Sequence, residues 1–295
     1  MYIYNNKNYI ININVCCKCI KDGLGNQLFH IACSYGYSRK YNKNCIIHLN
    51  SIEKTIFTHT DKSYINTIFS KYPKINISNY IINYNESYYN ACNYIELPNF
   101  NNNNELILLR GNFQNEKYFD FCKDDFIKTL NLPKINIIKR TCFIHIKRGD
   151  RVNSPLHDFN LDNYHYNAIN YIKIRRPFVK FLIFSNDIDY CKNHPIYNNY
   201  EIFNNNDEII NLTSMSLCEY GGISGNSTFS WWGGYLNNNK NKIITFPNKW
   251  FNDSNFIIDI YFKNSIVLSC DKYLYYKYKY LIIFIILIII LFIIK

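Results

Sequence analysis

The sequence predicts an α/β protein with two Rossmann-like domains that face a cleft, followed by a hydrophobic C-terminal tail. Short apolar segments of strand length alternate with segments of helical periodicity along most of the 295 residues. Such alternation is typical of parallel sheets with crossover helices, and the chain is long enough for about two domains. A candidate linker at residues 131–140 divides the series. We therefore expect domains at 1–135 and 136–272 and a tail at 273–295.

The composition narrows the class of partner. The net charge is +11, and hydrophobic residues make up 48% of the chain. Because the charge comes mostly from dispersed lysines and not from arginine-rich stripes, it disfavours a nucleic-acid partner and favours anionic substrates or a membrane surface. The eleven cysteines complete no zinc-site spacing, and the N-terminus does not resemble a secretory signal. These features predict free thiols in a reducing compartment.

The first half opens with a predicted strand, a glycine turn and a helix. Residues 15–20 are the strand, Gly23 and Gly25 form the turn, and residues 45–49 are the next strand. The turn either brings backbone amides and a helix N-terminus to a phosphate or is simply a tight turn. The apolar positions of the helix are Leu28, Phe29, Ala32, Cys33, Tyr35 and Gly36.

The middle of the chain is less regular. Residues 51–104 show no clear periodicity, and a strand is predicted at 106–109. A helix is predicted at 116–130, ending before Pro133. Its expected apolar face consists of Tyr118, Phe119, Phe121, Cys122, Phe126 and Leu130.

The second half repeats strand and helix in alternation. We predict strands at 143–146, 181–184 and 243–246 and helices at 163–173 and 209–220. This order again indicates a parallel sheet with crossover helices.

Residues 142–151, which read CFIHIKRGDR, are the central stretch. A short buried strand runs directly into Lys147 and Arg148, so two cations lie at the carboxyl end of a strand, where ligands bind in open α/β sheets. Paired cations suit a phosphate, although a solvated basic turn is the alternative. Side chains alternate along a strand, so Arg148 should point away from the face that His145 and Lys147 share, unless Gly149 bends the chain.

A strand followed by Asp187 and Asp189 leaves two interpretations open. Together the carboxylates would suit a divalent metal on a nucleotide diphosphate. Alternatively, Asp187 binds a base or ribose, and Asp189 caps the following turn.

Residues 225–237, GNSTFSWWGGYLN, resemble the third motif of glycosyltransferase family 11, the α-1,2-fucosyltransferases. Five other segments resemble this family's pattern in the same order. They are residues 23–29, 111–119, 145–150, 184–187 with Cys191, and 247–251.

This resemblance implies a GT-B-like fold and transfer of L-fucose from GDP-fucose, with inversion and without a required metal. The implied acceptor is a glycan hydroxyl, the 2-hydroxyl of galactose. His145 and Asp187 would read guanine, which favours the nucleotide interpretation of Asp187. Two alternatives stay open: a membrane-tethered glycan or nucleotide-sugar binding protein without turnover, and a GT-B transferase for another GDP-sugar.

The expected chemistry needs fixed donors around the departing diphosphate. The expected catalytic residues are Arg148, Lys147 and Asp150. Lys147 stands where the family normally has arginine; a lysine keeps the charge but loses the planar fork, so the enzyme could be slow or inactive. The expected GDP-fucose-binding residues are Gly23, Gly25, Asn26, Gln27, His145, Ser185, Asp187, Asn226, Ser227, Thr228, Phe229 and Ser230. Candidates for the general base are Asp150, Asp158 and Glu116, and Trp231 and Trp232 are expected to pack in the core.

The C-terminal residues 281–294 are uninterrupted apolar sequence. As a helix they would span about 21 Å, short of the ~30 Å hydrocarbon core. The preceding tyrosines and lysines suit a membrane interface, so we expect a tail anchor, with a buried or amphipathic last helix as the alternative. The lysines place the catalytic part in the cytosol, against which the sequons at Asn76 and Asn211 argue weakly.

Overall fold

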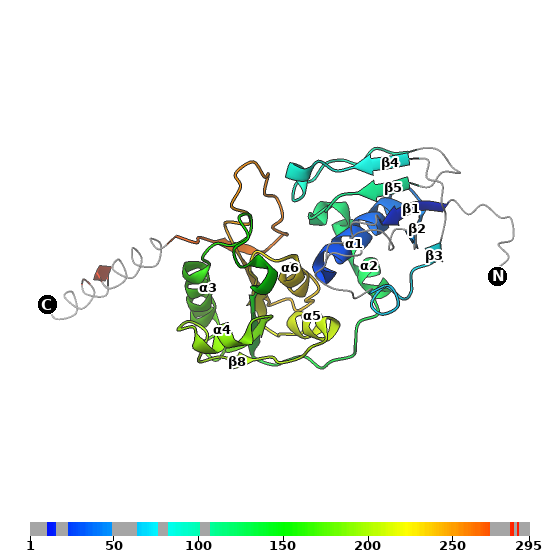
Figure 1. Cartoon of the computed structure of the whole chain (residues 1–295). Coiled ribbons are helices and arrows are strands. Elements are labelled where there is room, and N and C mark those ends of the chain that lie inside the picture. The colour runs from blue at the N-terminus through cyan, green and yellow to red at the C-terminus, as the bar shows by residue number, and fades with distance from the viewer. Residues whose placement is uncertain are drawn as a thin grey trace.

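The computed structural model describes residues 11–15, 23–48, 64–75, 82–100 and 107–271, together with 284, 285 and 288. Its strands form two parallel sheets, one from each half of the chain (Figure 1). The first sheet has the order β3-β2-β1-β5-β4. Its strands are β1 (Ile11–Val15), β2 (Asn44–His48), β3 (Lys74–Ile75), β4 (Ile82–Asn85) and β5 (Ile107–Arg110).

The second sheet has the order β11-β10-β9-β6-β7-β8, and all its pairs are parallel. The central pair is β6 with β9, and the strand order reverses there, as in a doubly wound fold. Its strands are β6 (Thr141–Ile146), β7 (Lys180–Ser185), β8 (Glu201–Ile202), β9 (Gly221–Ile223), β10 (Ile243–Pro247) and β11 (Ile266–Leu268). The predicted strands at 143–146, 181–184 and 243–246 are therefore confirmed.

The α-helices of the described residues are α1 (Leu24–Lys40), α2 (Lys123–Thr129), α3 (Asp162–Arg175), α4 (Ile188–Asn193), α5 (Glu208–Ser216) and α6 (Thr228–Tyr235). Short 3-10 turns are η3 (Tyr88–Asn90), η4 (Glu116–Tyr118), η5 (Asp120–Cys122) and η6 (Gly149–Arg151). The prediction for α3 is confirmed, because Tyr164, Ala168, Ile169 and Ile172 form its buried face.

Some predicted boundaries are wrong. The first strand is Ile11–Val15, and residues 16–20 of the predicted strand lie outside the described part. The helix predicted at 116–130 is broken, because Phe119 has φ −147° and ψ −1°, outside the helical region. As a result Phe121, predicted on the apolar face, is 61% exposed. The helix predicted at 209–220 ends at Ser216 with Leu217 as its C-cap, and Gly221, with φ +88°, already belongs to β9.

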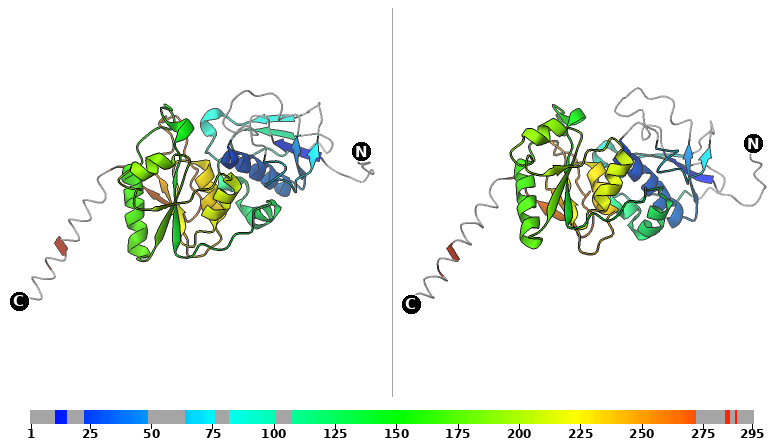
Figure 2. Two further views of the ribbon diagram at one scale, coloured as in Figure 1. Left: turned by 60° about the horizontal axis from the view of Figure 1, so that its bottom comes forward. Right: turned by 90° about the horizontal axis from the view of Figure 1, so that it is seen from below.

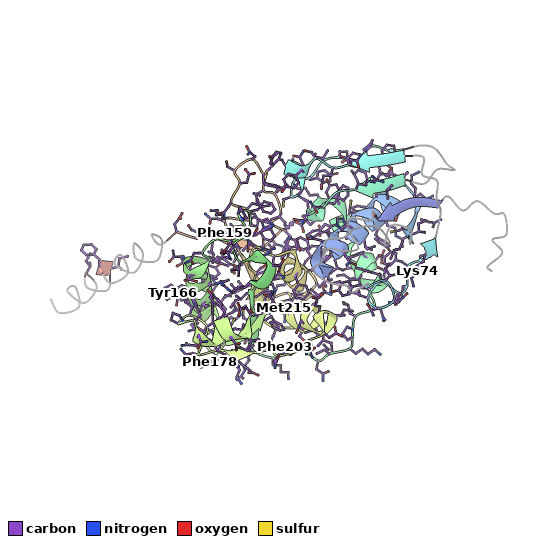
Figure 3. All side chains as sticks on the ribbon, viewed as in Figure 1. Lys74, Phe159, Tyr166, Phe178, Phe203 and Met215 are labelled. Carbon is purple, nitrogen blue, oxygen red and sulfur yellow. The ribbon has the colours of Figure 1, made fainter. Side chains whose placement is uncertain are left out.

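One hydrophobic cluster joins the two halves. Phe29 of α1 lies 4.5 Å from Trp231 and 5.1 Å from Trp232 of α6, between ring centroids, and Phe119 stacks on Trp232. Both tryptophans are fully buried, as expected. Figure 2 shows the blue helix α1 beside the yellow helices in both views. The buried Met215 of α5, labelled in Figure 3, packs against α6 at Gly233.

The chain also returns from the second sheet to the first. Ile258 forms a parallel bridge with Cys92, and the Asn115 amide donates to the Asp259 carbonyl at 2.6 Å. The described cysteines are all free thiols. Within the described part of the chain, we find no helix with the length and apolarity needed to cross a membrane. The predicted tail at 281–294 lies outside this part except at residues 284, 285 and 288.

Candidate active site

The candidate site lies where the strand order of the second sheet reverses. Lys147 and Arg148 follow β6, and Gly225 and Asn226 follow β9, so the carboxyl ends of the two central strands bring them together. A cavity of about 220 Å³ opens between them. Phe159, labelled in Figure 3, lines it from the loop that precedes α3. The cavity therefore occupies the position where open α/β sheets bind ligands.

The two predicted cations point to different partners. The Lys147 ammonium lies 2.5 Å from a carboxylate oxygen of Asp150. Arg148 donates from Nε to Asp187 at 3.2 Å, and its guanidinium lies 3.9 Å from the centre of the Tyr190 ring. Both cations line the same cavity, whereas Asp150 does not. The paired carboxylates keep both side chains in place while leaving them about one third exposed.

The turn after the strand depends on Gly149. Its φ of +54° lies in the left-handed region, which glycine adopts without strain. A Cβ there would lie 2.4 Å from the Asn186 amide nitrogen. Asn186 in turn accepts a hydrogen bond from the Arg148 amide at 2.8 Å. The resulting 3-10 turn η6 brings its last residue, Arg151, back to the cavity.

Arg151 was missed in the sequence analysis. Its guanidinium is partly buried and donates to the carbonyl of Asn226, immediately before α6. Burial lowers the pKa of Arg151 to about 10, against a smaller opposing effect of Asp150, so it stays charged at neutral pH. The only sequence signal was its position directly after the KRGD motif.

Three histidines line the cavity and are held neutral. Burial lowers the pKa of His145 and His165 to about 3 and that of His157 to about 4. Smaller contributions in the same direction come from Lys147 and Arg151 at His145, from Arg151 at His157 and from the neighbouring His194 at His165. Each has one buried ring nitrogen without a hydrogen-bond partner among the residues that the structure describes: Nδ1 of His145, Nδ1 of His157 and Nε2 of His165. The other nitrogen of His165 contacts the Tyr197 hydroxyl at 2.6 Å. Buried imidazoles with open hydrogen-bonding capacity suit a polar ligand.

Asp187 has a structural role that the sequence analysis assigned to Asp189. Asp187 is the N-cap of α4, and its carboxylate accepts from the Tyr190 amide at 3.0 Å. Ser185 supports it by accepting from the Asp187 amide at 3.0 Å. Asp189 lies inside the first turn of α4, so the expected cap at Asp189 is wrong. The described residues contain no cluster of three or more His, Cys, Asp or Glu side chains that could hold a metal ion.

The N-termini of α1 and α6 meet where Gly25 approaches Thr228 and Phe229. Gly25 lies in the first turn of α1 and not in a preceding turn, which corrects the sequence interpretation. A Cβ at Gly25 would lie 2.5 Å from the Phe229 amide nitrogen, so glycine permits this approach. Neither helix has an acidic residue in its first turn. Because the N-cap of α6 directly follows the cavity-lining Asn226, the first amides of α6 provide partial positive charge at that edge of the cavity.

The remaining expected binding residues differ in their surroundings. Asn226 lines the cavity, and its amide donates to the carbonyls of His157 and Trp250 at 3.3 Å. Ser227 is the N-cap of α6, although its side chain makes no capping bond. Thr228 and Phe229 pack against Gly25. Ser230 is buried and bonds to Ser224, so it contributes to the internal packing.

On the first sheet, the expected residues cluster at the start of α1. Gly23 is its exposed N-cap, Gln27 is buried, and Asn26 accepts from the Gln114 amide at 3.2 Å. A further carboxylate, Glu86, follows β4; burial raises its pKa to about 7, opposed by hydrogen bonds from two backbone amides. Its neighbourhood was not predicted because residues 51–104 carry no clear periodicity.

The base candidates are now separated by position. Asp158 lines the cavity, and its carboxylate accepts from the Asn153 amide at 2.7 Å. Asp150 is paired with Lys147. Glu116 accepts from the Lys263 amide, and it does not line the cavity. Of the three, only Asp158 is placed to meet a ligand in this cavity.

Comparisons with known proteins identify the family. The family model described as Glycosyl transferase family 11 matches residues 121–268, half of the chain. The chain belongs to glycosyl transferase family 11. An alpha-1,2-colitosyltransferase of Escherichia coli is 28% identical over 273 residues, covering 78% of this chain and 90% of that relative. The O-antigen biosynthesis glycosyltransferase WbnK of Escherichia coli is 32% identical over 151 residues, covering 48% of each chain.

As a member of glycosyl transferase family 11, the protein is a transferase that acts with a sugar donor and an acceptor. The matched segment contains the whole second sheet and every residue that lines the cavity. The family assignment and the geometry therefore concern the same part of the molecule.

Proposed function

We propose that this family 11 glycosyltransferase moves L-fucose from GDP-fucose to a glycan hydroxyl, the 2-hydroxyl of galactose, with inversion. The observation that carries the proposal is the cavity at the strand reversal, which combines cations with buried neutral imidazoles. The cations suit the diphosphate of the donor, and the neutral imidazoles can donate hydrogen bonds to its guanine base or accept them from it. The two sheets are then the two halves of a GT-B-like enzyme, with the donor on the second.

The chemistry follows from charge. The acceptor oxygen attacks the anomeric carbon, the bond from that carbon to the phosphate oxygen breaks, and GDP leaves with the electron pair. Negative charge grows on the β-phosphate, where Lys147, Arg148 and the first amides of α6 can stabilise it. Because these cations supply the positive charge, the proposal requires no metal. Asp158 is the favoured base for the acceptor proton, since it lines the cavity.

A second candidate is transfer of another sugar from its GDP donor. The colitosyltransferase relative favours this alternative, because its alignment covers most of both chains. A binding protein without turnover is the third candidate, and it rests on the lysine at position 147, which lacks the bidentate fork of arginine.

The first experiment measures nucleotide binding to the full chain in detergent. Calorimetry with GDP, UDP and ADP should show GDP binding about tenfold or more tightly, which is roughly 1.4 kcal/mol. His145→Phe should weaken the preference for GDP, whereas His194→Phe should not, because His194 does not line the cavity. Tighter binding of UDP than of GDP would refute the donor assignment.

The second experiment detects the product. The enzyme is incubated with GDP-L-fucose or GDP-colitose and a panel of galactosides, and mass spectrometry reads the mass of the transferred sugar. Transfer of fucose supports the first candidate, and exclusive transfer of colitose supports the second. GDP binding without transfer of either sugar supports the third.

A further inference from the structure

The three cations of the cavity differ in how far they are neutralised. Lys147 is paired with Asp150 at 2.5 Å, and Arg148 with Asp187 at 3.2 Å. Arg151 makes no ion pair with any carboxylate in the described part of the chain; its contact there is with the Asn226 carbonyl. A guanidinium carries five N–H donors, so most of its donors are left for a ligand.

The position of Arg151 indicates what kind of ligand it meets. The turn η6, closed by a hydrogen bond of 3.0 Å from the Arg151 amide to the Arg148 carbonyl, carries the side chain back across the cavity. Its guanidinium is then anchored on Asn226, directly before the N-cap Ser227 of α6. The charge is thus added to the positive end of a helix whose first turn contains no acidic residue.

Partial burial makes such a charge costly unless an anion compensates it. The groups around it compensate only in part: His145 and His157 are neutral, and Asp150, whose opposing effect on the pKa of Arg151 is smaller than that of burial, is paired with Lys147. An oxyanion that contacts both the guanidinium and the α6 amides would complete the site. A diphosphate, with several oxygens and a geometry that matches the planar fork, suits this arrangement.

We propose that Arg151 is a diphosphate-binding residue of this enzyme, acting with the N-terminus of α6. The proposal rests on the proposed function, because it assigns a contact within the same donor site. It adds a residue outside the predicted Lys147 and Arg148 pair.

The test compares a nucleoside diphosphate with the nucleoside that lacks the phosphates. Calorimetry on the full chain measures GDP and guanosine with the wild type, Arg151→Met, Arg151→Lys and the control Arg175→Met, an exposed arginine outside the cavity. Arg151→Met should weaken GDP roughly 10- to 100-fold and guanosine less than about twofold. Arg151→Lys should fall between the wild type and Arg151→Met, and Arg175→Met should match the wild type.

Equal losses for GDP and guanosine would overturn the proposal, because Arg151 would then act by holding the loop. Unchanged GDP binding would overturn it as well. If Arg151→Met does not fold, the comparison of Arg151→Lys with the wild type decides, since lysine keeps the charge. If the wild type prefers UDP, the guanine assignment fails separately, and the same variants are judged with UDP and uridine.

Discussion

Acid should destabilise this protein through its buried histidines. His145 and His165 are 5% and 2% exposed, and burial lowers the pKa of each to about 3. In the unfolded chain a histidine has a pKa of about 6.5. The pKa of each histidine is lower in the folded protein than in the unfolded chain. The folded protein therefore keeps its full free energy of unfolding above about pH 6.5 and loses part of it as the pH falls towards 3.

The magnitude follows from the linkage relation. A pH of 5 lies about 1.5 units below the pKa of a histidine in the unfolded chain, whereas both histidines are still neutral in the folded protein. Each histidine therefore lowers the free energy of unfolding at pH 5 by roughly 2 kcal/mol. Two such groups cost about 4 kcal/mol, a large part of a typical unfolding free energy of about 5–15 kcal/mol. Glu86 acts in the opposite direction: its pKa, raised to about 7, favours the folded state below that value.

Urea unfolding at pH 7.5 and pH 5.0 measures this loss in the wild type and in His165→Asn. Asparagine can keep a polar contact with Tyr197, which lies 2.6 Å from Nδ1 of His165, but does not titrate. The variant should lose about 2 kcal/mol less than the wild type between the two pH values. The control Phe178→Ser, at an exposed side chain, keeps both buried histidines and should lose as much as the wild type. Equal losses in the wild type and His165→Asn would refute the reasoning.

Four further predictions concern packing, charge, metal and membrane. Gly25→Ala should destabilise the protein by about 1–3 kcal/mol in urea unfolding, because the methyl group would collide with α6; an unchanged midpoint would contradict the close approach. Lys147→Arg should raise turnover about tenfold or more by restoring a bidentate donor, and Arg148→Ala should lower it, both measured by steady-state kinetics; near-normal turnover of Arg148→Ala would place the phosphate elsewhere. Activity should persist in EDTA, and loss with recovery on adding Mn²⁺ would show a metal requirement. A chain without residues 272–295 should become soluble in cell fractionation, and continued membrane binding would rule out the anchor.

Local patterns in the sequence determined the regular elements and the centre of the site. Apolar periodicity located α3, β6, β7 and β10 because each buries one continuous face or segment in its own sheet. The cations after β6 were also recognisable, since residues at the carboxyl end of a parallel strand point towards the ligand side. The resemblance to family 11 came from contiguous motifs and is confirmed by the family match.

Only the tertiary structure decided which side chains share the cavity. His165 lies on a helix, His157 in a loop and Arg151 after a glycine turn, and sequence spacing says nothing about their meeting at one sheet edge. The strand order, with β9 next to β6, depends on long crossover connections. The ion pairs also depend on the tertiary structure. Asp150 pairs with Lys147 and Asp187 with Arg148, whereas the contact of Arg151 among the described residues is with a backbone carbonyl. Ion pairs form between charges that folding brings within a few ångströms, so a one-dimensional pattern cannot assign them.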